Sequence, residues 1–454
     1  MKRIQIQVDP LRGSIVKGMT LFALPIMATS FLQMLFSSFD TMVIGKFGSD
    51  TAMAAVGACT SIIMLIVSCA TALNTGISIT VGTCYGTGKL EEIRAILQSL
   101  PLSGFCIGLF VTIPVTFFSE PLLRLVRCPE NLLMQSGCYF RIYFLSVPFM
   151  MVFSFLSAVL QARGQSLQPF IIQIFCSAVN LGLNLLFVIV FHWDIAGVAI
   201  ATVISQFLSA ALILLYFVFI EKEVPMCLCG LTFFKNLGHV LRLGIPTALE
   251  GMIMNLSGVV VQAAINGFPE HIISGNAVAT SIEGLTCVAF VGFASGSVVF
   301  ISQNYGRGDL ERVRKIYRTT MLLVFTLGEA IGILVYLLAP QLLSLYTDSA
   351  QIAEIARLRM LFMCLSQGLC GTMNCISGCI QGLGDTKTPL IISLATSCGF
   401  RILWVCTVAQ WIGSISAIYV SYPICWGLTT LLSIIAFTRL LKKRQKALIQ
   451  ANEN

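Results

Sequence analysis

Charged side chains are scarce in this sequence: Asp, Glu, Lys and Arg make up 11% of its 454 residues. A soluble domain usually carries about 25%. Hydrophobic residues make up 57% of the chain, and its mean hydropathy is +0.89. This composition excludes a soluble globular domain and is typical of an integral membrane protein.

The residue patterns of common enzymes are also missing. The three histidines are isolated, and the chain contains neither HExxH nor GxSxG. Gly86-Thr87-Gly88-Lys89 resembles the end of a phosphate-binding loop, but Thr83 replaces its first glycine and Leu90 its Ser/Thr. We therefore expect no enzymatic activity and no cofactor other than a coupling ion.

Cysteine is abundant, with 17 residues, but no CxxC pair has the spacing of zinc ligands. Most cysteines stand singly within apolar runs. Small, weakly polar side chains of this kind suit packing between helices, and we expect no metal site built from them.

Apolar runs long enough to cross a hydrocarbon core of about 30 Å recur along the whole chain. None shows the alternation of a β-barrel strand, so we expect transmembrane helices. The first run is too long for a signal peptide. The twelve expected spans lie near residues 15–44, 51–81, 93–118, 137–160, 168–192, 195–220, 240–265, 272–301, 317–346, 355–380, 389–411 and 413–438.

The net charge of +8 is placed asymmetrically. With the N-terminus inside, 21 of the 28 Lys and Arg residues fall in cytoplasmic segments, as in a bacterial inner-membrane protein with both termini cytoplasmic. The basic cluster 439–446 is expected to anchor the last helix at an anionic lipid surface. The predicted partners are the lipid bilayer and a small-molecule substrate, with no nucleic acid, and the chain is expected to be a monomer.

An internal repeat is the strongest single signal. Tyr85-Gly86-Thr87-Gly88-Lys89-Leu90-Glu91 returns, at an offset of 220, as Tyr305-Gly306-Arg307-Gly308-Asp309-Leu310-Glu311. The same offset pairs Gly164 with Gly384 and Pro169 with Pro389, and an offset of 221 pairs Pro25 with Pro246. Secondary transporters are commonly built from such repeats around a site near the bilayer midplane.

The repeat predicts an all-α membrane protein with two six-helix lobes that are parallel repeats. The predicted divisions are an N-terminal lobe at 1–220, a cytoplasmic loop at 221–240, a C-terminal lobe at 241–438 and a basic cytoplasmic tail at 439–454. Three GxxxG spacings, at Gly104/Gly108, Gly292/Gly296 and Gly328/Gly332, are expected to allow close helix contacts within a lobe. Pro25 and Pro246 permit bends in the first and seventh spans.

Four acids are expected within the spans. Asp40 should lie in the outer half of the first span, where a carboxylate is costly unless it is protonated, paired or beside water. It is either an ion-coupling group or an interfacial acid. Glu250 and Glu283 should lie near the midplane as coupling groups or as neutral structural acids, and Glu329 between two glycines reads as structural.

The intramembrane cations and amides complete the candidate site. Arg141 and Arg401 are the expected buried cations, and Arg401 is a candidate partner for a C-lobe Glu. Asn180 and Asn184 lie one helical turn apart, and either hydrogen-bond Asp40 or join two helices. The 31 Phe and 17 Met supply polarizable apolar walls, which favour a promiscuous cavity only weakly.

The order of several short motifs resembles the multidrug and toxic compound extrusion (MATE) family, in its bacterial branch similar to DinF, over nearly the whole chain. Leu24-Pro25 through Gln33 to Asp40 resembles the opening helix, whose acid is the family's ion-coupling residue. Further matches are Ala55-Val56-Gly57, Ile142-Tyr143-Phe144, Gly244-Ile245-Pro246, Gly275-Asn276-Ala277, Ile282-Glu283-Gly284 and Gly382-Leu383-Gly384-Asp385-Thr386.

This resemblance implies a V-shaped fold of two six-helix lobes and an antiporter that exports cationic or amphipathic organic compounds in exchange for H⁺ or Na⁺. Asp40 is then the coupling residue, and Na⁺, if used, would bind at Asp40 or Glu283. The expected substrate-site and cavity residues are Gln33, Asn180, Asn184, Glu250, Asn255, Asn276, Glu283 and Arg401.

Three departures from the family pattern bear on coupling. Gln165 replaces the acid of the N-lobe turn that Asp385 keeps in the C-lobe, and Asn184 stands where some archaeal members carry Asp. Glu250 follows Pro246 more closely than the acid of the sodium-coupled branch follows its proline. These features favour protons. The alternatives are a flippase for lipid-linked precursors and a membrane scaffold or sensor without transport.

Overall fold

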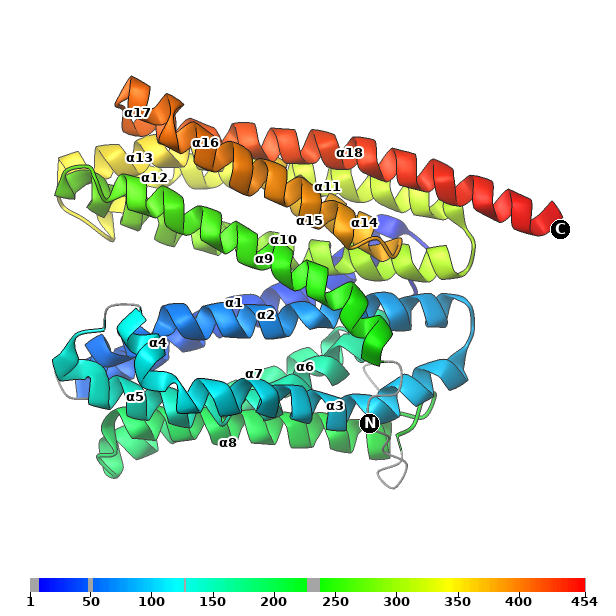
Figure 1. The fold of residues 1–454 in the computed structure, drawn as a ribbon, viewed down its shortest axis with the longest axis horizontal. Coiled ribbons are helices and arrows are strands. Elements are labelled where there is room, and N and C mark those ends of the chain that lie inside the picture. Colours follow the sequence, from blue (N-terminus) through cyan, green and yellow to red (C-terminus); the bar gives the residue numbers. More distant parts are fainter. Residues whose placement is uncertain (1–7, 48–51, 126–127, 227–236, 454) are drawn as a thin grey trace. The chain divides into compact units, whose positions relative to one another are not determined.

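The computed structural model describes residues 8–47, 52–125, 128–226 and 237–453, and within these ranges the regular structure is helical throughout. Contacts divide the chain into two compact units. We call Ala28–Arg242 the N-unit, and Val8–Met27 together with Leu243–Asn454 the C-unit. Within each unit the axes of the long helices are roughly aligned, and the chain reverses direction from one long helix to the next (Figure 1).

The described residues of the first half of the chain form eight α-helices and two π-helical segments. These are α1 (Ile15–Phe47), α2 (Ala52–Gly86), α3 (Leu90–Phe117), α4 (Ser119–Leu125), α5 (Glu130–Phe144), α6 (Val147–Ala162), α7 (Leu167–Leu185), η1 (Leu186–Val190), α8 (Asp194–Leu215) and η2 (Tyr216–Ile220).

In the second half, the part that the structure describes forms ten α-helices and one further π segment. These are α9 (Leu237–Ile265), α10 (Glu270–Gly306), α11 (Leu310–Leu337), α12 (Ala339–Ser344), α13 (Ala350–Cys364), α14 (Gln367–Gly382), α15 (Lys387–Ser393), η4 (Leu394–Phe400), α16 (Arg401–Cys406), α17 (Val408–Ile412) and α18 (Ile415–Glu453).

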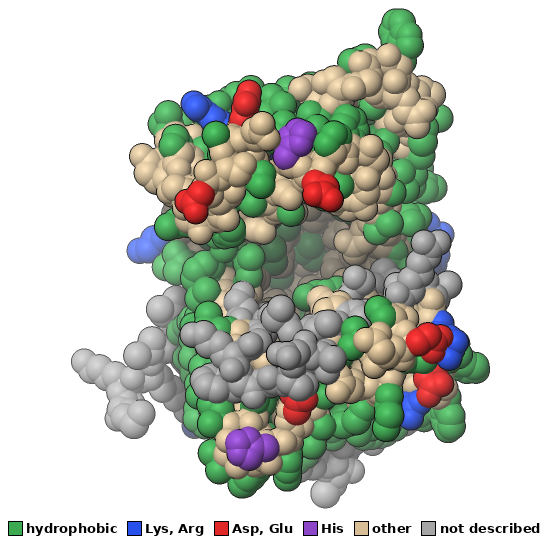
Figure 2. All heavy atoms as spheres, turned by 90° about the vertical axis from the view of Figure 1, so that its left-hand side faces the viewer, with side chains coloured by type: hydrophobic (Ala, Val, Ile, Leu, Met, Phe, Trp, Pro, Cys, Tyr) green, Lys and Arg blue, Asp and Glu red, His purple; other side chains and the backbone are tan. Residues whose placement is uncertain are grey.

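The described residues contain eleven helical segments long and apolar enough to span a membrane. The bent pair α13 and α14, which meet at 45°, makes a twelfth when it is counted as one span. The predicted all-α architecture with twelve spans is therefore confirmed. Figure 2 looks onto one end of the helices, where a few charged side chains lie among hydrophobic ones, as expected where helices leave the hydrocarbon layer.

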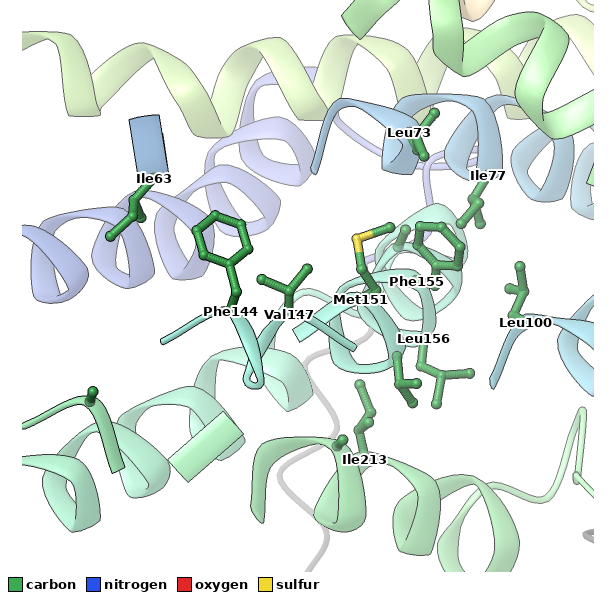
Figure 3. Close-up of a cluster of buried hydrophobic side chains, with 14 of the residues drawn as sticks. Ile63, Leu73, Ile77, Leu100, Phe144, Val147, Met151, Phe155, Leu156 and Ile213 are labelled. Carbon is green, nitrogen blue, oxygen red and sulfur yellow. The ribbon is translucent and has the colours of Figure 1, made fainter. Parts of the chain in front are cut away.

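The N-unit core lies between α2, α3, α5, α6 and α8. Figure 3 shows part of it, with Phe144, Met151 and Phe155 pointing toward side chains from neighbouring helices. Phe144, Met151 and Phe155 are fully buried. Asn74 on α2 donates a hydrogen bond to Ser154 Oγ on α6 at 2.5 Å, so a polar pair also joins these helices.

The repeat seen in the sequence recurs as a repeated helix contact. A Cβ at Gly108 on α3 would collide with Pro148 on α6. The corresponding positions in the second half make the same contact, because a Cβ at Gly328 on α11 would lie 2.8 Å from Gly368 on α14. The glycines at this crossing let the backbones approach closely in both units.

One turn further along these helices, the small and large partners are exchanged. In the N-unit, Gly104 on α3 lies against Met151 on α6. In the C-unit, the corresponding positions are Val324 and Gly371, and a Cβ at Gly371 would lie 2.8 Å from the Val324 side chain. Either arrangement leaves room for one side chain between the helices, so the crossing is kept while the sequence changes.

The turn glycines that the repeat pairs also have matching backbone conformations. Gly88 and Gly308 have φ of +77° and +81°, and Gly164 and Gly384 both have φ of +83°. This left-handed region is open to glycine at little cost. The backbone conformation therefore explains why glycine stands at both copies of each turn.

The first helix departs from the predicted division of the chain. The sequence placed the whole first span with residues 1–220, whereas Val8–Met27 pack within the C-unit. Gly292 and Gly296 on α10 contact Ala23 and Met19 of this segment, so this GxxxG spacing holds α1 against α10. Arg312 donates hydrogen bonds to the carbonyls of Pro10 and Gly13 at 3.3 and 3.2 Å.

An arginine is stacked over the turn tyrosine in each unit, but it comes from a different place. Arg163, fully buried after α6, lies 5.9 Å from the centre of the Tyr85 ring and pairs with Glu221 at 3.2 Å and with Glu223. In the C-unit, Arg444 on α18 lies 5.5 Å from the centre of the Tyr305 ring.

Burial lowers the pKa of Arg163, but its pairing with Glu221 and Glu223 raises it more, so the pKa lies above its ordinary value. This guanidinium therefore remains charged at every physiological pH. The ion pairs tie the end of α6 to the segment after η2.

We predict that Gly332→Ala destabilises the protein, because its Cβ would collide with the carbonyl oxygen of Cys364 across the α11–α13 contact. Inserting a methyl group at such a contact costs about 1–3 kcal/mol. The measurement is the thermal unfolding midpoint of purified protein in detergent. The matched control is Gly258→Ala on α9, where nothing lies within 4 Å. Equal midpoints for the two variants would contradict the contact.

Candidate functional site

The coupling candidate Asp40 belongs to α1, but its side chain lies outside the part of the chain that the structure describes. Its predicted role therefore stays a prediction. Gln33, two turns earlier on α1, is exposed. Asn255 on α9 is exposed as well.

Asn180 and Asn184 form a pair on α7. Asn184 is fully buried and donates a hydrogen bond from Nδ2 to Asn180 Oδ1 at 3.3 Å. Two buried carboxamides on one helix face give the N-unit a polar spot inside an apolar helix. The predicted bond between this pair and Asp40 stays a prediction.

Glu250 on α9 lies in a pocket of uncharged donors within the C-unit. Ser377 and Gln381 on α14 donate hydrogen bonds to its carboxylate at 2.9 and 3.0 Å, and Ser393 at the end of α15 donates one at 3.2 Å. The side chain is buried. Among the described residues no Lys or Arg forms an ion pair with it.

A buried carboxylate with neutral partners only is an unusual arrangement. The charged form carries a desolvation cost of several kcal/mol that three neutral hydrogen bonds offset only in part. Binding a proton removes most of that cost. The surroundings of Glu250 therefore fit both roles expected from the sequence, a group that exchanges a cation and a neutral structural acid.

Glu283 on α10 is in a different situation, because it is paired with a cation. Arg359 on α13 donates from Nε to Glu283 Oε1 at 2.9 Å and from Nη2 to Oε2 at 2.8 Å. Its remaining Nη1 donates to Asn276 Oδ1 at 2.6 Å, and Asn276 donates to Gln262 on α9 at 3.1 Å. This network joins α9, α10 and α13 and favours a structural role for Glu283.

The expected arginine contacts were wrong at two positions. Arg141 is not buried: its side chain is 49% exposed and pairs with Glu120 at 3.1 Å. Arg401 is buried, but among the described residues it forms no ion pair with a C-lobe acid, and Glu283 pairs with Arg359 instead. Arg359 was missed because its position near the start of the tenth span reads as an interfacial cation.

Arg401 instead touches aromatic and hydroxyl groups. Its Nη1 donates a long hydrogen bond of 3.4 Å to Ser257 Oγ on α9, and its guanidinium lies 4.4 Å from the centre of the Tyr422 ring on α18. Glu329, by contrast, accepts a hydrogen bond from the backbone N–H of Gly368 at 3.1 Å, in keeping with its predicted structural role.

No group of three or more His, Cys, Asp or Glu side chains that could hold a metal ion occurs in residues 8–47, 52–125, 128–226 and 237–453.

The family model MatE matches residues 25–186 and again residues 246–407. The chain belongs to the MatE family. The two matches begin at Pro25 and Pro246, the prolines that the internal repeat pairs, so each half of the repeat is one copy of the family's unit. Membership of the family makes this chain a multi-pass membrane transporter of the efflux type.

Curated relatives extend over nearly the whole chain. The probable multidrug resistance protein YoeA of Bacillus subtilis is 24% identical over 446 residues, 96% of each chain. The probable multidrug resistance protein NorM of Thermotoga maritima is 25% identical over 399 residues, 85% of this chain and 83% of its own.

Solved structures share the fold. A crystal structure of MATE in complex with MaD3S matches with a TM-score of 0.87 at 19% identity, covering 97% of this chain and 100% of the other. An outward-facing multidrug resistance MATE transporter of the MOP superfamily also matches with 0.87, at 18% identity, covering 98% and 100%. The fold of this MatE protein is therefore that of the family.

We predict that Arg359→Met destabilises the protein by about 3 kcal/mol or more, since it leaves Glu283 buried without its cation. The double variant Glu283→Gln/Arg359→Met removes both charges and should be less destabilised than Arg359→Met alone. Thermal unfolding in detergent measures both. The double variant should also keep gradient-dependent transport, and its loss would show that Glu283 takes part in coupling.

Proposed function

We propose that this protein is an inner-membrane antiporter that exports cationic or amphipathic organic compounds in exchange for protons, with both termini in the cytoplasm. The family and the names of its relatives support export of organic compounds. The carboxylate of Glu250, buried among neutral donors, is the observation that favours ion coupling within the C-unit.

Asp40 on α1 is the proposed coupling group of the N-unit, with Asn180 and Asn184 as its polar neighbours. Glu250 is the proposed coupling group of the C-unit, in preference to Glu283, whose carboxylate is taken by Arg359. Proton binding from outside lowers the affinity for the exported compound, and loading from inside requires that the proton has left.

We favour protons over Na⁺ because a carboxylate binds a proton without further ligands, whereas a bound sodium ion needs several oxygen atoms facing it. Of the three partners of Glu250, Gln381 presents its Nε2, which cannot serve as an oxygen ligand. A potential of 100 mV supplies about 2.3 kcal/mol for each coupled charge. That energy supports an accumulation of roughly 50-fold at about 1.4 kcal/mol per decade.

We predict that Glu250→Gln, which keeps the size of the side chain but cannot ionise and has an NH2 donor in place of one acceptor oxygen, slows proton-driven ethidium transport at least about tenfold, a loss of about 1.4 kcal/mol of coupling. Asp40→Asn should do the same at equal expression. Transport is measured in proteoliposomes with an imposed pH gradient. Glu329→Gln is the matched control and should retain transport. Unchanged gradient dependence in Glu250→Gln and Asp40→Asn would overturn the coupling assignment.

The coupling ion is tested separately in the wild-type protein. We predict that a pH gradient alone drives ethidium transport in sodium-free proteoliposomes, because a single carboxylate with hydrogen-bond donors exchanges a proton. A sodium gradient at equal pH on both sides should drive none. Transport driven by sodium alone, with no response to the pH gradient, would contradict proton coupling.

A further inference from the structure

One edge of the Arg401 guanidinium has no partner among the described residues. The side chain is 5% exposed, and the atoms Nε and Nη2 are buried without a hydrogen bond to any residue in that part of the chain. Nη1 donates a hydrogen bond, at 3.4 Å to Ser257 Oγ. A buried guanidinium with unpaired N–H groups is costly, so such a group is kept for a partner that the protein itself does not supply.

Arg359 in the same unit shows what fits that edge. Its Nε and Nη2, the same two atoms, donate to the two oxygens of Glu283 at 2.9 and 2.8 Å. This side-on pair is the geometry in which a guanidinium binds a carboxylate with two parallel hydrogen bonds. The edge that Glu283 fills on Arg359 is the edge that no described side chain fills on Arg401.

The balance of charged side chains around Arg401 also favours binding of an anion. Arg359 and Arg401 lie 5.5 and 4.4 Å from the centre of the same Tyr422 ring, so the two cations share one aromatic neighbour. Glu283 neutralises one of them, which leaves one positive charge in excess at this cluster. Tyr419 one turn earlier on α18 packs against Arg359, and its buried Oη has no hydrogen-bond partner among the described residues.

The backbone that carries Arg401 is irregular. The π segment η4 ends at Phe400, directly before Arg401. The helix α16 that follows is only six residues long and ends at Cys406. Segments of π-helix often mark functional positions, because their hydrogen bonding can shift by one residue. Because α16 is short and lies between η4 and the helix end at Cys406, a small shift of its backbone can change the direction of the Arg401 side chain.

We propose that the Nε–Nη2 edge of Arg401 binds a carboxylate, and that the transporter therefore takes amphipathic compounds that carry a carboxylate beside their apolar or cationic part. Ser257 and Tyr422 contact the guanidinium and hold it in place. The transport half of this inference rests on the proposed function, whereas carboxylate binding does not.

The test is fluorescence anisotropy binding to the purified protein in detergent, with rhodamine B, which carries a free carboxylate, and its ethyl ester. Wild-type protein should bind the free acid more tightly than the ester. Arg401→Gln should weaken binding of the acid about 10- to 100-fold, the range for charge-assisted hydrogen bonds, and leave binding of the ester unchanged. Arg401→Lys, which keeps the charge without the two-pronged edge, should fall between the two.

Binding of the ester serves as the folding control for each variant. A second control needs no substitution: benzoate should compete with rhodamine B for the wild-type protein, and benzamide, which is uncharged, should not. Equal losses for acid and ester in Arg401→Gln, or equal competition by benzoate and benzamide, would overturn the proposal. If replacing chloride by sulfate changes binding of both dyes and Arg401→Gln abolishes that change, the site holds an inorganic anion and the carboxylate assignment is wrong.

Transport of the two dyes separates this inference from the proposed function. With an imposed pH gradient, proteoliposomes of wild-type protein should move the acid, and Arg401→Gln should raise its KM while KM for the ester stays constant. If neither dye is moved but the difference in binding remains, proton-driven export is wrong and the carboxylate site stands.

Discussion

A charge within the hydrocarbon layer must find its partner inside the protein, and this constraint orders the buried groups of the C-unit. Glu283 and Arg359 satisfy each other through two hydrogen bonds, with Asn276 taking the third donor. Glu250 has neutral donors only, and Arg401 has a single long hydrogen bond, among the residues that the structure describes. The less completely a group is paired by the protein, the more its energy depends on what binds there.

The scaffold around these groups is symmetric, although the groups themselves are not. The crossing of α3 and α6 at Gly108 recurs at Gly328 between α11 and α14, and the turn glycines repeat with nearly identical φ. By contrast, the first-half counterparts of Glu283, Arg359 and Arg401 in the repeat are Ile63, Tyr139 and Leu181, which carry no charge. The two halves therefore share the same helix packing, whereas these three buried charges occur in the second half and have no charged counterpart at the matching positions of the first.

The features that depend on local pattern could be predicted from the sequence. Twelve apolar runs gave the spans, and matching glycines and prolines gave the repeat. What could not be predicted is which helices pack against each other and bring their side chains into contact. The pairing of Glu283 with Arg359 needs α10 and α13 to lie side by side. The two residues are 76 positions apart, and no local sequence pattern predicts a contact over that separation. Likewise, hydropathy marks α1 as one span but not that its residues up to Met27 pack on α10.

The same limit applies to Arg401, whose burial follows from its place in a span but whose partners come from α9 and α18. Charge counting favours pairing it with the nearest available acid. The structure shows a different arrangement, because Arg359 pairs with both oxygens of Glu283 while Arg401 contacts Ser257 and Tyr422. Composition alone cannot distinguish these two arrangements, since both contain the same three charges.

Glu250 and Arg401 lie along one seam between α9 and the irregular segment from α15 to α16. Ser393, which donates to Glu250, is the last residue before η4, and Ser257 donates to the carbonyl of Ser397 inside η4 while accepting from Arg401. A proton on Glu250 weakens the hydrogen bond from Ser393, because a neutral acid is a poorer acceptor than a carboxylate. The π segment η4 begins at the residue after Ser393 and leads directly into Arg401. The proposed proton site and the proposed carboxylate site are therefore built on the same short piece of backbone.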